Sequence, residues 1–212
     1  MSFRLLPIAA ALALCTAVTA CGQPSTVSSD TSTSQGSTST SFPMTMANCG
    51  RKFTVASQPQ RIVSLNQGTT EILLSLGLAK QMVGTATWTD PVLPSLAGEN
   101  AQVRRLADNN ASFETVIAQR PDLVTASFAN TLSDSGSGSY EKFGQLKVPA
   151  YMSFVECQKA AFKSGSSDGR RSTPVTMADI DHDITDIAAL TGTQGRGKKL
   201  VAVSYTHLRA HE

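Results

Sequence analysis

Polar and aromatic side chains follow four apolar segments of this chain, at the points where those segments end. They are Asn66, Gln67, Trp88, Phe128 and Phe154. An indole in a turn is costly to leave without a partner, so we interpret this set as the border of a ligand-binding site. The alternative is that Trp88 packs under its own loop and that Phe128 and Phe154 belong to the local core.

Arg104 and Arg105 could add an anion-binding element to such a site. Guanidinium groups suit the carboxylate or catecholate oxygens of an anionic chelate. The alternative is a solvated surface, which is where two arginines in a loop are more often found.

The sequence offers little for catalysis. It has no P-loop or HExxH motif. One histidine, His182, precedes the C-terminal segment, and it is flanked by Asp181 and Asp183 on a helix that we expect to be solvated. A Ser-His-Asp triad and a free-metal site, which needs several His and acid ligands, are therefore disfavoured. We predict no catalytic residue, no metal ligand and no cofactor.

The segment Arg61–Gly84 contains the unit that must position these side chains. Ile62–Leu65 reads as a buried strand, and Thr69 or Thr70 is the expected helix cap, with Glu71 in the first turn. The helix should close near Gly77, before a second strand. Such βαβ units cross over right-handed into parallel sheets, and ligands bind beyond the carboxyl ends of the strands.

Further elements repeat this pattern and predict an α/β fold with a parallel, Rossmann-like sheet. The expected strands are Lys52–Val55 at an edge, Met82–Thr87, Leu123–Ser127 and one within Val148–Phe154. The expected helices begin at Ser112, Tyr140 and Thr176, where Asp179 would complete a capping box, and near Lys198. Residues 158–173 read as a long irregular insertion.

The amino-terminal residues read as a targeting signal and a tether. Residues 1–20 have a positive start and a short apolar segment, and Val18–Gly22 resembles the lipobox of bacterial lipoproteins. The resemblance implies lipidation of Cys21 and anchoring on the extracytoplasmic face of the cell membrane. The alternative is an ordinary secretory signal. Residues 21–45, rich in serine and threonine, should form a flexible tether.

Two cysteines remain once Cys15 leaves with the signal and Cys21 is lipidated. In an oxidising compartment Cys49 and Cys157 are most simply a disulfide, and the alternative is two free thiols. The formal net charge of +2 gives no reason to expect a nucleic-acid partner. Residues 203–212, VSYTHLRAHE, resemble a translated sequencing adapter, so we expect a non-native tail and native sequence continuing beyond Ala202.

The order of RIVSL, TEILLSLGL, FETVIAQRPDLV and VPAYMSF, after a lipobox and a tether, resembles one family. It is the substrate-binding lipoproteins of ABC importers for iron–siderophore complexes, haem and vitamin B12. The segments NCGRK and TATWTDP are similar to those of iron–siderophore members of Gram-positive type. The resemblance covers roughly Cys49 to Ala202.

This resemblance implies two α/β lobes with the ligand in the cleft between them. Residues 46–175 would form the N-terminal lobe and 176–202 the start of the inter-lobe helix, with the second lobe absent from this chain. It implies a monomer that binds a ferric siderophore, whose own groups hold the iron. Glu114 would dock on the permease, although a helix N-terminus also favours an acid there. The alternatives are haem or cobalamin binding, a lipid-anchored hydrolase and a structural module.

Overall fold

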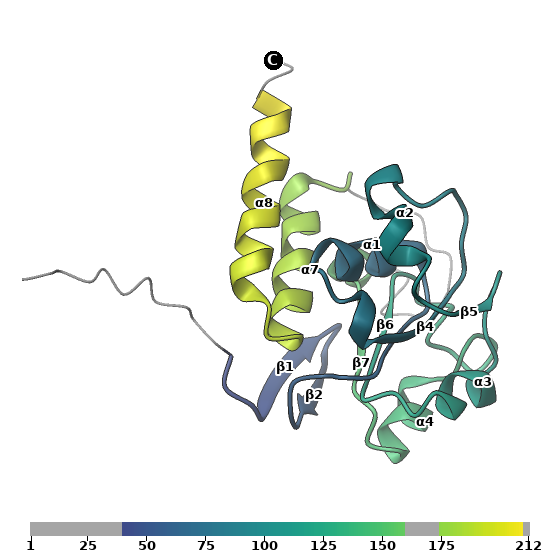
Figure 1. The fold of residues 1–212 in the computed structure, drawn as a ribbon. Helices are drawn as coiled ribbons and strands as arrows, with labels where there is room; N and C mark the ends of the chain where they lie inside the picture. The colour runs from purple at the N-terminus through teal and green to yellow at the C-terminus, as the bar shows by residue number, and fades with distance from the viewer. Residues whose placement is uncertain (1–39, 160–173, 210–212) are drawn as a thin grey trace, which may run out of the picture. The chain divides into compact units, whose positions relative to one another are not determined.

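A five-stranded parallel sheet forms the centre of the described part of the chain (Figure 1). The computed structural model describes residues 40–159 and 174–209, with side chains up to residue 204. The strands are β3 (Ile62–Ser64), β4 (Met82–Ala86), β5 (Arg105–Ala107), β6 (Leu123–Ala126) and β7 (Ala150–Met152). They lie in the order β5-β4-β3-β6-β7, and all pairs are parallel. The predicted α/β fold with a parallel sheet is confirmed.

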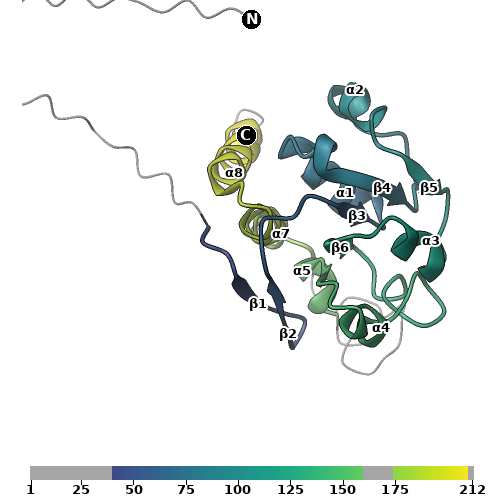
Figure 2. The ribbon, with the colours of Figure 1, turned by 60° about the horizontal axis from the view of Figure 1, so that its bottom comes forward.

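Helices cover both faces of this sheet (Figure 2). They include α1 (Gln67–Ser75) and α7 (Met177–Leu190) on one face, and α3 (Phe113–Ala118) and α4 (Tyr140–Gln145) on the other. Successive strand residues point to opposite faces. Ile62 accordingly joins the core cluster that contains Ile187 of α7, whereas Val63 joins the cluster that contains Val116 and Phe143.

The strand order reverses between β3 and β6. From β3 the chain proceeds to β4 and β5 on one side, and then returns to β6 and β7 on the other. The loops that leave β3 and β6 therefore diverge at the carboxyl edge of the sheet, the edge where all five strands end. Such a switch point is where open parallel sheets bind ligands.

Several helix ends follow the local sequence signals. The α1 helix closes at Gly77, which has a φ of 66°. Ser112 caps α3 by accepting a hydrogen bond from the backbone N–H of Thr115. Thr176 and Asp179 form the capping box of α7. All three predictions are confirmed.

The start of α1 differs from the prediction. The helix begins at Gln67, and Asn66 stands at the N-cap without a side-chain capping bond. Thr69 and Thr70 are buried inside the helix, where they hydrogen-bond to Ser64. Glu71 therefore lies beyond the first turn. The capping signal placed the start of α1 too late, because the hydroxyls of these threonines hydrogen-bond to Ser64 of β3 instead of capping the helix.

The sequence did not predict the pairing of β1 with β2 in a hairpin, or the strand β5. The expected edge strand is β2 (Arg51–Val55), which pairs antiparallel with β1 (Met44–Asn48) in a separate two-stranded sheet. Since β1 begins at Met44 and the Thr40 hydroxyl donates to the Ala189 carbonyl (3.2 Å), the tether prediction extended too far. Residues 1–39, with the expected signal and Cys21, and 160–173 lie outside the described residues.

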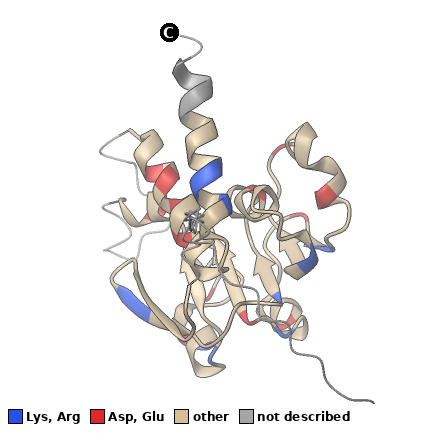
Figure 3. Cartoon of the chain, turned by 60° about the vertical axis from the view of Figure 1, so that its left-hand side comes forward, with Lys and Arg blue, Asp and Glu red and all other residues tan. Residues whose placement is uncertain are grey.

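Shorter helices and a last long helix complete the described part. They are η1 (Ala79–Gln81), η2 (Pro94–Leu96), α2 (Ala97–Asn100), α5 (Phe154–Cys157) and α8 (Gln194–Arg209). The α8 helix starts before the expected Lys198 and continues past Ala202. It lies beside α7, with acidic residues on α7 and basic residues near the start of α8 (Figure 3). No described helix is long and apolar enough to cross a membrane.

Candidate functional site

Asn66 links the two loops that diverge at the switch point. Its side-chain oxygen accepts a hydrogen bond from the backbone N–H of Ser127 (2.8 Å), and its Nδ2 donates to the Thr131 hydroxyl (3.2 Å). Asn66 is 1% exposed. The structure thus places Asn66 at the predicted edge, but as a buried tie between the loops after β3 and β6.

Gln67 binds the loop after β4 in a similar way. Its Oε1 accepts hydrogen bonds from the backbone N–H groups of Thr89 (3.2 Å) and Asp90 (3.0 Å). Its Nε2 donates to the Glu71 carboxylate (3.0 Å). The first residue of α1 therefore fixes the loop that carries Trp88.

Trp88 and Arg105 lie together at the β4–β5 side of this edge. The Arg105 guanidinium group lies 5.1 Å from the Trp88 ring centroid and pairs with Asp108 (3.1 Å). The indole N–H of Trp88, which is half-buried, donates to the Thr85 hydroxyl (3.3 Å). Arg105 lies in β5 and not in the loop that the sequence predicted, whereas Arg104 precedes the strand and is exposed.

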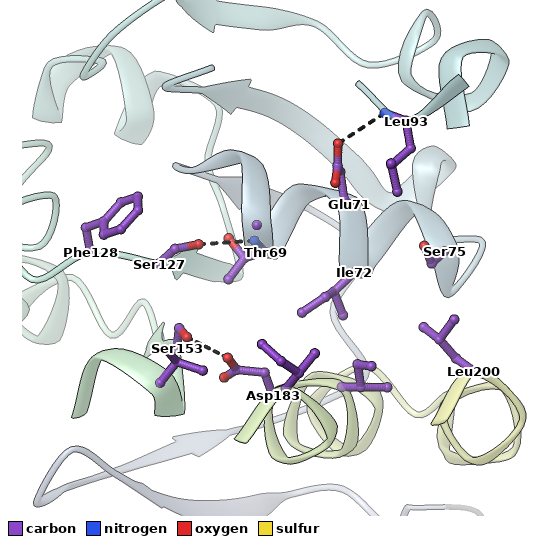
Figure 4. A pocket seen from close by; sticks show the side chains of 14 residues that line it. Thr69, Glu71, Ile72, Ser75, Leu93, Ser127, Phe128, Ser153, Asp183 and Leu200 are labelled. Carbon is purple, nitrogen blue, oxygen red and sulfur yellow. Dashed lines mark hydrogen bonds between the residues drawn. The ribbon is translucent and has the colours of Figure 1, made fainter. Parts of the chain in front are cut away.

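An apolar cavity of about 400 Å³ opens beside α1 at the carboxyl edge (Figure 4). Its walls include Ile72 of α1, Ile184 of α7 and Leu200 of α8, and the exposed side chains of Leu93 and Phe128 stand at its border. Of the predicted ligand-binding residues, only Phe128 lines it. Sequence reasoning missed the other walls because they come from helices that tertiary packing brings together.

A buried polar cluster lies under one end of this cavity. Asp183, 4% exposed, accepts hydrogen bonds from the Tyr151 hydroxyl (2.7 Å), the Ser153 hydroxyl (2.5 Å) and the backbone N–H of Phe154 (2.6 Å). Burial and the neighbouring carboxylates of Asp183 and Asp186 raise the pKa of Tyr151. The expectation that this part of α7 is solvated is therefore wrong for Asp183, which connects the helix to β7 and α5.

Phe154 faces away from the apolar cavity. Its ring stacks on the His182 imidazole with centroids 3.8 Å apart and an interplanar angle of 17°. The His182 Nε2 lies 3.4 Å from the Asp186 carboxylate. Phe154, His182 and Asp186 instead line a second hollow of about 460 Å³ beside the hairpin turn. The structure thus separates Phe154 from Phe128.

A disulfide joins Cys49 in the hairpin turn to Cys157 at the end of α5. The neighbouring Asn48 side chain donates to the Met152 carbonyl (2.8 Å) and accepts from the Met152 N–H (2.9 Å). The amino-terminal hairpin is therefore fixed to the β7 side of the sheet by one covalent and two hydrogen-bonded links.

Glu114 is exposed in the first turn of α3. Hydrogen bonds from its own backbone N–H and from Ser112 lower its pKa, so it presents a carboxylate at the surface. Within the described residues, no group of three or more His, Cys, Asp or Glu side chains could hold a metal ion.

The comparisons with known proteins agree with this architecture. The family model for periplasmic binding proteins matches residues 62–209. The chain belongs to the periplasmic binding protein family. An uncharacterized ABC transporter substrate-binding lipoprotein of Bacillus subtilis, YvrC, is 30% identical over 156 residues, which are 69% of this chain and 46% of that protein. This chain therefore spans about half the length of this curated relative.

Two solved periplasmic binding proteins share the fold at 24% identity. One, from Veillonella parvula, aligns with a TM-score of 0.66 over 79% of this chain and 52% of its own. The other, an ABC-type Fe3+-hydroxamate transport system from Saccharomonospora viridis, aligns with a TM-score of 0.62 over 80% and 56%. Both alignments cover only about half of the solved chain.

Proposed function

We propose that this chain is the N-terminal part of an extracytoplasmic lipoprotein that captures a ferric siderophore and delivers it to an ABC importer. The observation that carries the proposal is the shared carboxyl edge. Hydrogen bonds link the loops after β3, β4 and β6 there. Phe128 lines an apolar cavity at this edge, and Trp88 lies beside Arg105 on its β4–β5 side. Pockets of this kind, largely apolar with a few polar groups, are typical of small-molecule sites.

The comparisons favour this assignment within the family. Periplasmic binding proteins are transport components rather than enzymes, which disfavours the lipid-anchored hydrolase. The Bacillus subtilis relative is named a substrate-binding lipoprotein, and one structural relative is named for Fe3+-hydroxamate transport. The siderophore supplies the ligands of its own iron, so the protein holds the chelate through rings, amides and apolar walls.

The proposal also covers the membrane anchor, the permease contact, the second lobe and the C-terminal tail. Lipidation of Cys21 anchors the protein on the outer face of the cell membrane, and Glu114 docks on the permease. The protein acts as a monomer with a second lobe across the carboxyl edge, and residues 203–212 are a non-native tail. Arg105, Trp88 and Phe128 are the described residues that we assign to ligand contact.

The test is a calorimetric titration of the protein at its full natural length. The ligands are a ferric trihydroxamate, a ferric tricatecholate, haem and cobalamin, with the iron-free chelators as controls. We expect saturable binding of a ferric chelate and weaker binding of the iron-free form. Binding of haem or cobalamin alone would move the assignment to those ligands, and binding of none would contradict it.

A further inference from the structure

The lining of the apolar cavity beside α1 contains two acidic residues and, among the residues that the structure describes, no basic residue. The two acidic residues are Glu71 and Asp183 (Figure 4). Glu71 is held in place, because its Oε1 accepts hydrogen bonds from the Gln67 side chain (3.0 Å) and the backbone N–H of Leu93 (3.2 Å). All three hydrogen-bond donors to Asp183 are uncharged groups.

Among the described cations, Lys159 and Arg105 are paired with acids, whereas Arg196 of α8 donates to the Gly77 carbonyl (3.2 Å) beyond the end of α1. Lys159, whose Nζ lies 5.9 Å from the Phe128 ring centroid, is 2.8 Å from the Glu156 carboxylate. Arg105 pairs with Asp108 on the other side of the edge. His182 faces Asp186 in the second hollow. A ligand in the apolar cavity therefore meets two carboxylates and, among the described lining residues, no lysine or arginine, since Arg105 and Arg196 lie outside this lining.

This charge distribution discriminates between the two main chemical classes of ferric chelate. Three hydroxamates carry three negative charges and form a neutral complex with Fe3+, whereas three catecholates carry six and leave a net charge of −3. Like charges across an interface suppress the wrong partner, and desolvation inside an apolar cavity strengthens the repulsion.

We propose that the cavity between α1, α7 and α8 receives the apolar side of a neutral ferric trihydroxamate, and that Glu71 excludes chelates with a net negative charge. This inference rests on the proposed function and makes it more specific. It commits the cavity to the ligand and not to another segment of the protein.

The first test changes the charge and keeps the shape. Glu71→Gln retains an acceptor for Gln67 and Leu93, and Glu99→Gln removes the same charge from the exposed α2 helix, outside the cavity lining. Each variant, at full natural length, is titrated with ferrichrome and with ferric enterobactin. We expect the parent to prefer ferrichrome at least about 10-fold, and Glu71→Gln to strengthen enterobactin binding about 5- to 10-fold with little effect on ferrichrome. Glu99→Gln should change neither.

The second test fills the cavity. Ser75 is exposed at the end of α1 and lines the cavity, whereas Ser95 is exposed in η2 and does not. Ser75→Trp should weaken ferrichrome binding at least about 10-fold and Ser95→Trp less than about 2-fold, with thermal unfolding as the folding check. Equal binding by both tryptophan variants would assign the cavity to another occupant and overturn the inference.

The two levels of the proposal fail in different ways. If neither chelate binds, the ferric siderophore assignment fails and this inference fails with it. If both chelates bind equally and Glu71→Gln changes neither affinity, only the charge discrimination is overturned.

Discussion

Asn66 and Ser127 join the two sides of the sheet at its switch point. The 2.8 Å hydrogen bond from the Ser127 N–H to the Asn66 side chain connects the loop after β3 with the loop after β6, which carries Phe128. Because Asn66 is buried, this bond sets the geometry of the site without touching a ligand.

Asn66→Ala should therefore destabilise the protein. Removing the amide leaves the Ser127 N–H and the Thr131 hydroxyl without their partner, which costs about 1–3 kcal/mol for buried groups. Urea unfolding measures the loss, and Asn130→Ala, at an exposed position in the neighbouring loop, is the control. A loss no larger than that of the control would show that Asn66 does not tie these loops.

Removal of the disulfide should cost more. Cys49 and Cys157 are 108 residues apart, and the chain-entropy model gives about 4–5 kcal/mol for a loop of this length. We expect the double variant Cys49→Ser/Cys157→Ser to lose about 2–5 kcal/mol in urea unfolding. The parent under reducing conditions should fall to the same value, and reductant should not affect the variant. A parent that is insensitive to reductant would argue against the bond.

Arg105 and Arg104 should differ in their effect on Trp88. Trp88 is the only tryptophan in this chain, so intrinsic emission reports its surroundings alone. Arg105→Ala removes the cation over the ring and should shift the emission to longer wavelength, with a loss of about 0.5–1 kcal/mol in stability. Arg104→Ala should leave the spectrum unchanged. Equal shifts in the two variants would contradict the stacking.

Asp186 should make stability depend on pH. Burial raises the pKa of its carboxyl above the usual range, although His182 and the Tyr151 hydroxyl lower it and Asp183 raises it further. The native state therefore holds this proton more tightly than the unfolded chain. The protonated Asp186 carboxyl therefore stabilises the fold fully below its unfolded-state pKa of about 3.9. This stabilisation is lost as pH rises through the pKa of Asp186 in the folded state.

Asp186→Asn removes this titration. Its stability relative to the parent should therefore increase as pH rises from below about 3.9 through the raised pKa of Asp186 in the folded state. Urea unfolding at several pH values gives the difference. Glu99→Gln, at an exposed position, should give a difference that is constant with pH. A constant difference for Asp186→Asn as well would refute the raised pKa.

The sheet was predictable from the sequence because its strands are short apolar runs separated by helix signals. Ile62–Leu65 and Leu123–Ser127 carry β-branched residues that are buried on both faces. Capping residues such as Ser112 and Thr176 act locally, so they too could be read directly. The β5 strand was missed because its residues, Arg105–Ala107, are exposed or half-buried and show no continuous apolar run.

The site was predictable only in part. Strand-end residues could be placed at one edge, because parallel strands end together. The direction of each side chain could not, since it depends on tertiary partners. Asn66 turns inward to Ser127, and Phe154 turns to His182 on the hairpin side. The walls that α7 and α8 supply to the cavity depend on packing between segments far apart in the chain.

Hydrogen–deuterium exchange of the full-length protein, with and without a ferric trihydroxamate, tests the central claim most directly. We expect the ligand to protect peptides that cover residues 66–69, 87–93 and 127–131, where the loops after β3, β4 and β6 meet. The β1–β2 hairpin, residues 44–55, should exchange at the same rate in both states. Protection confined to the hairpin, or saturable binding without protection of these three loops, would contradict a ligand site at the carboxyl edge.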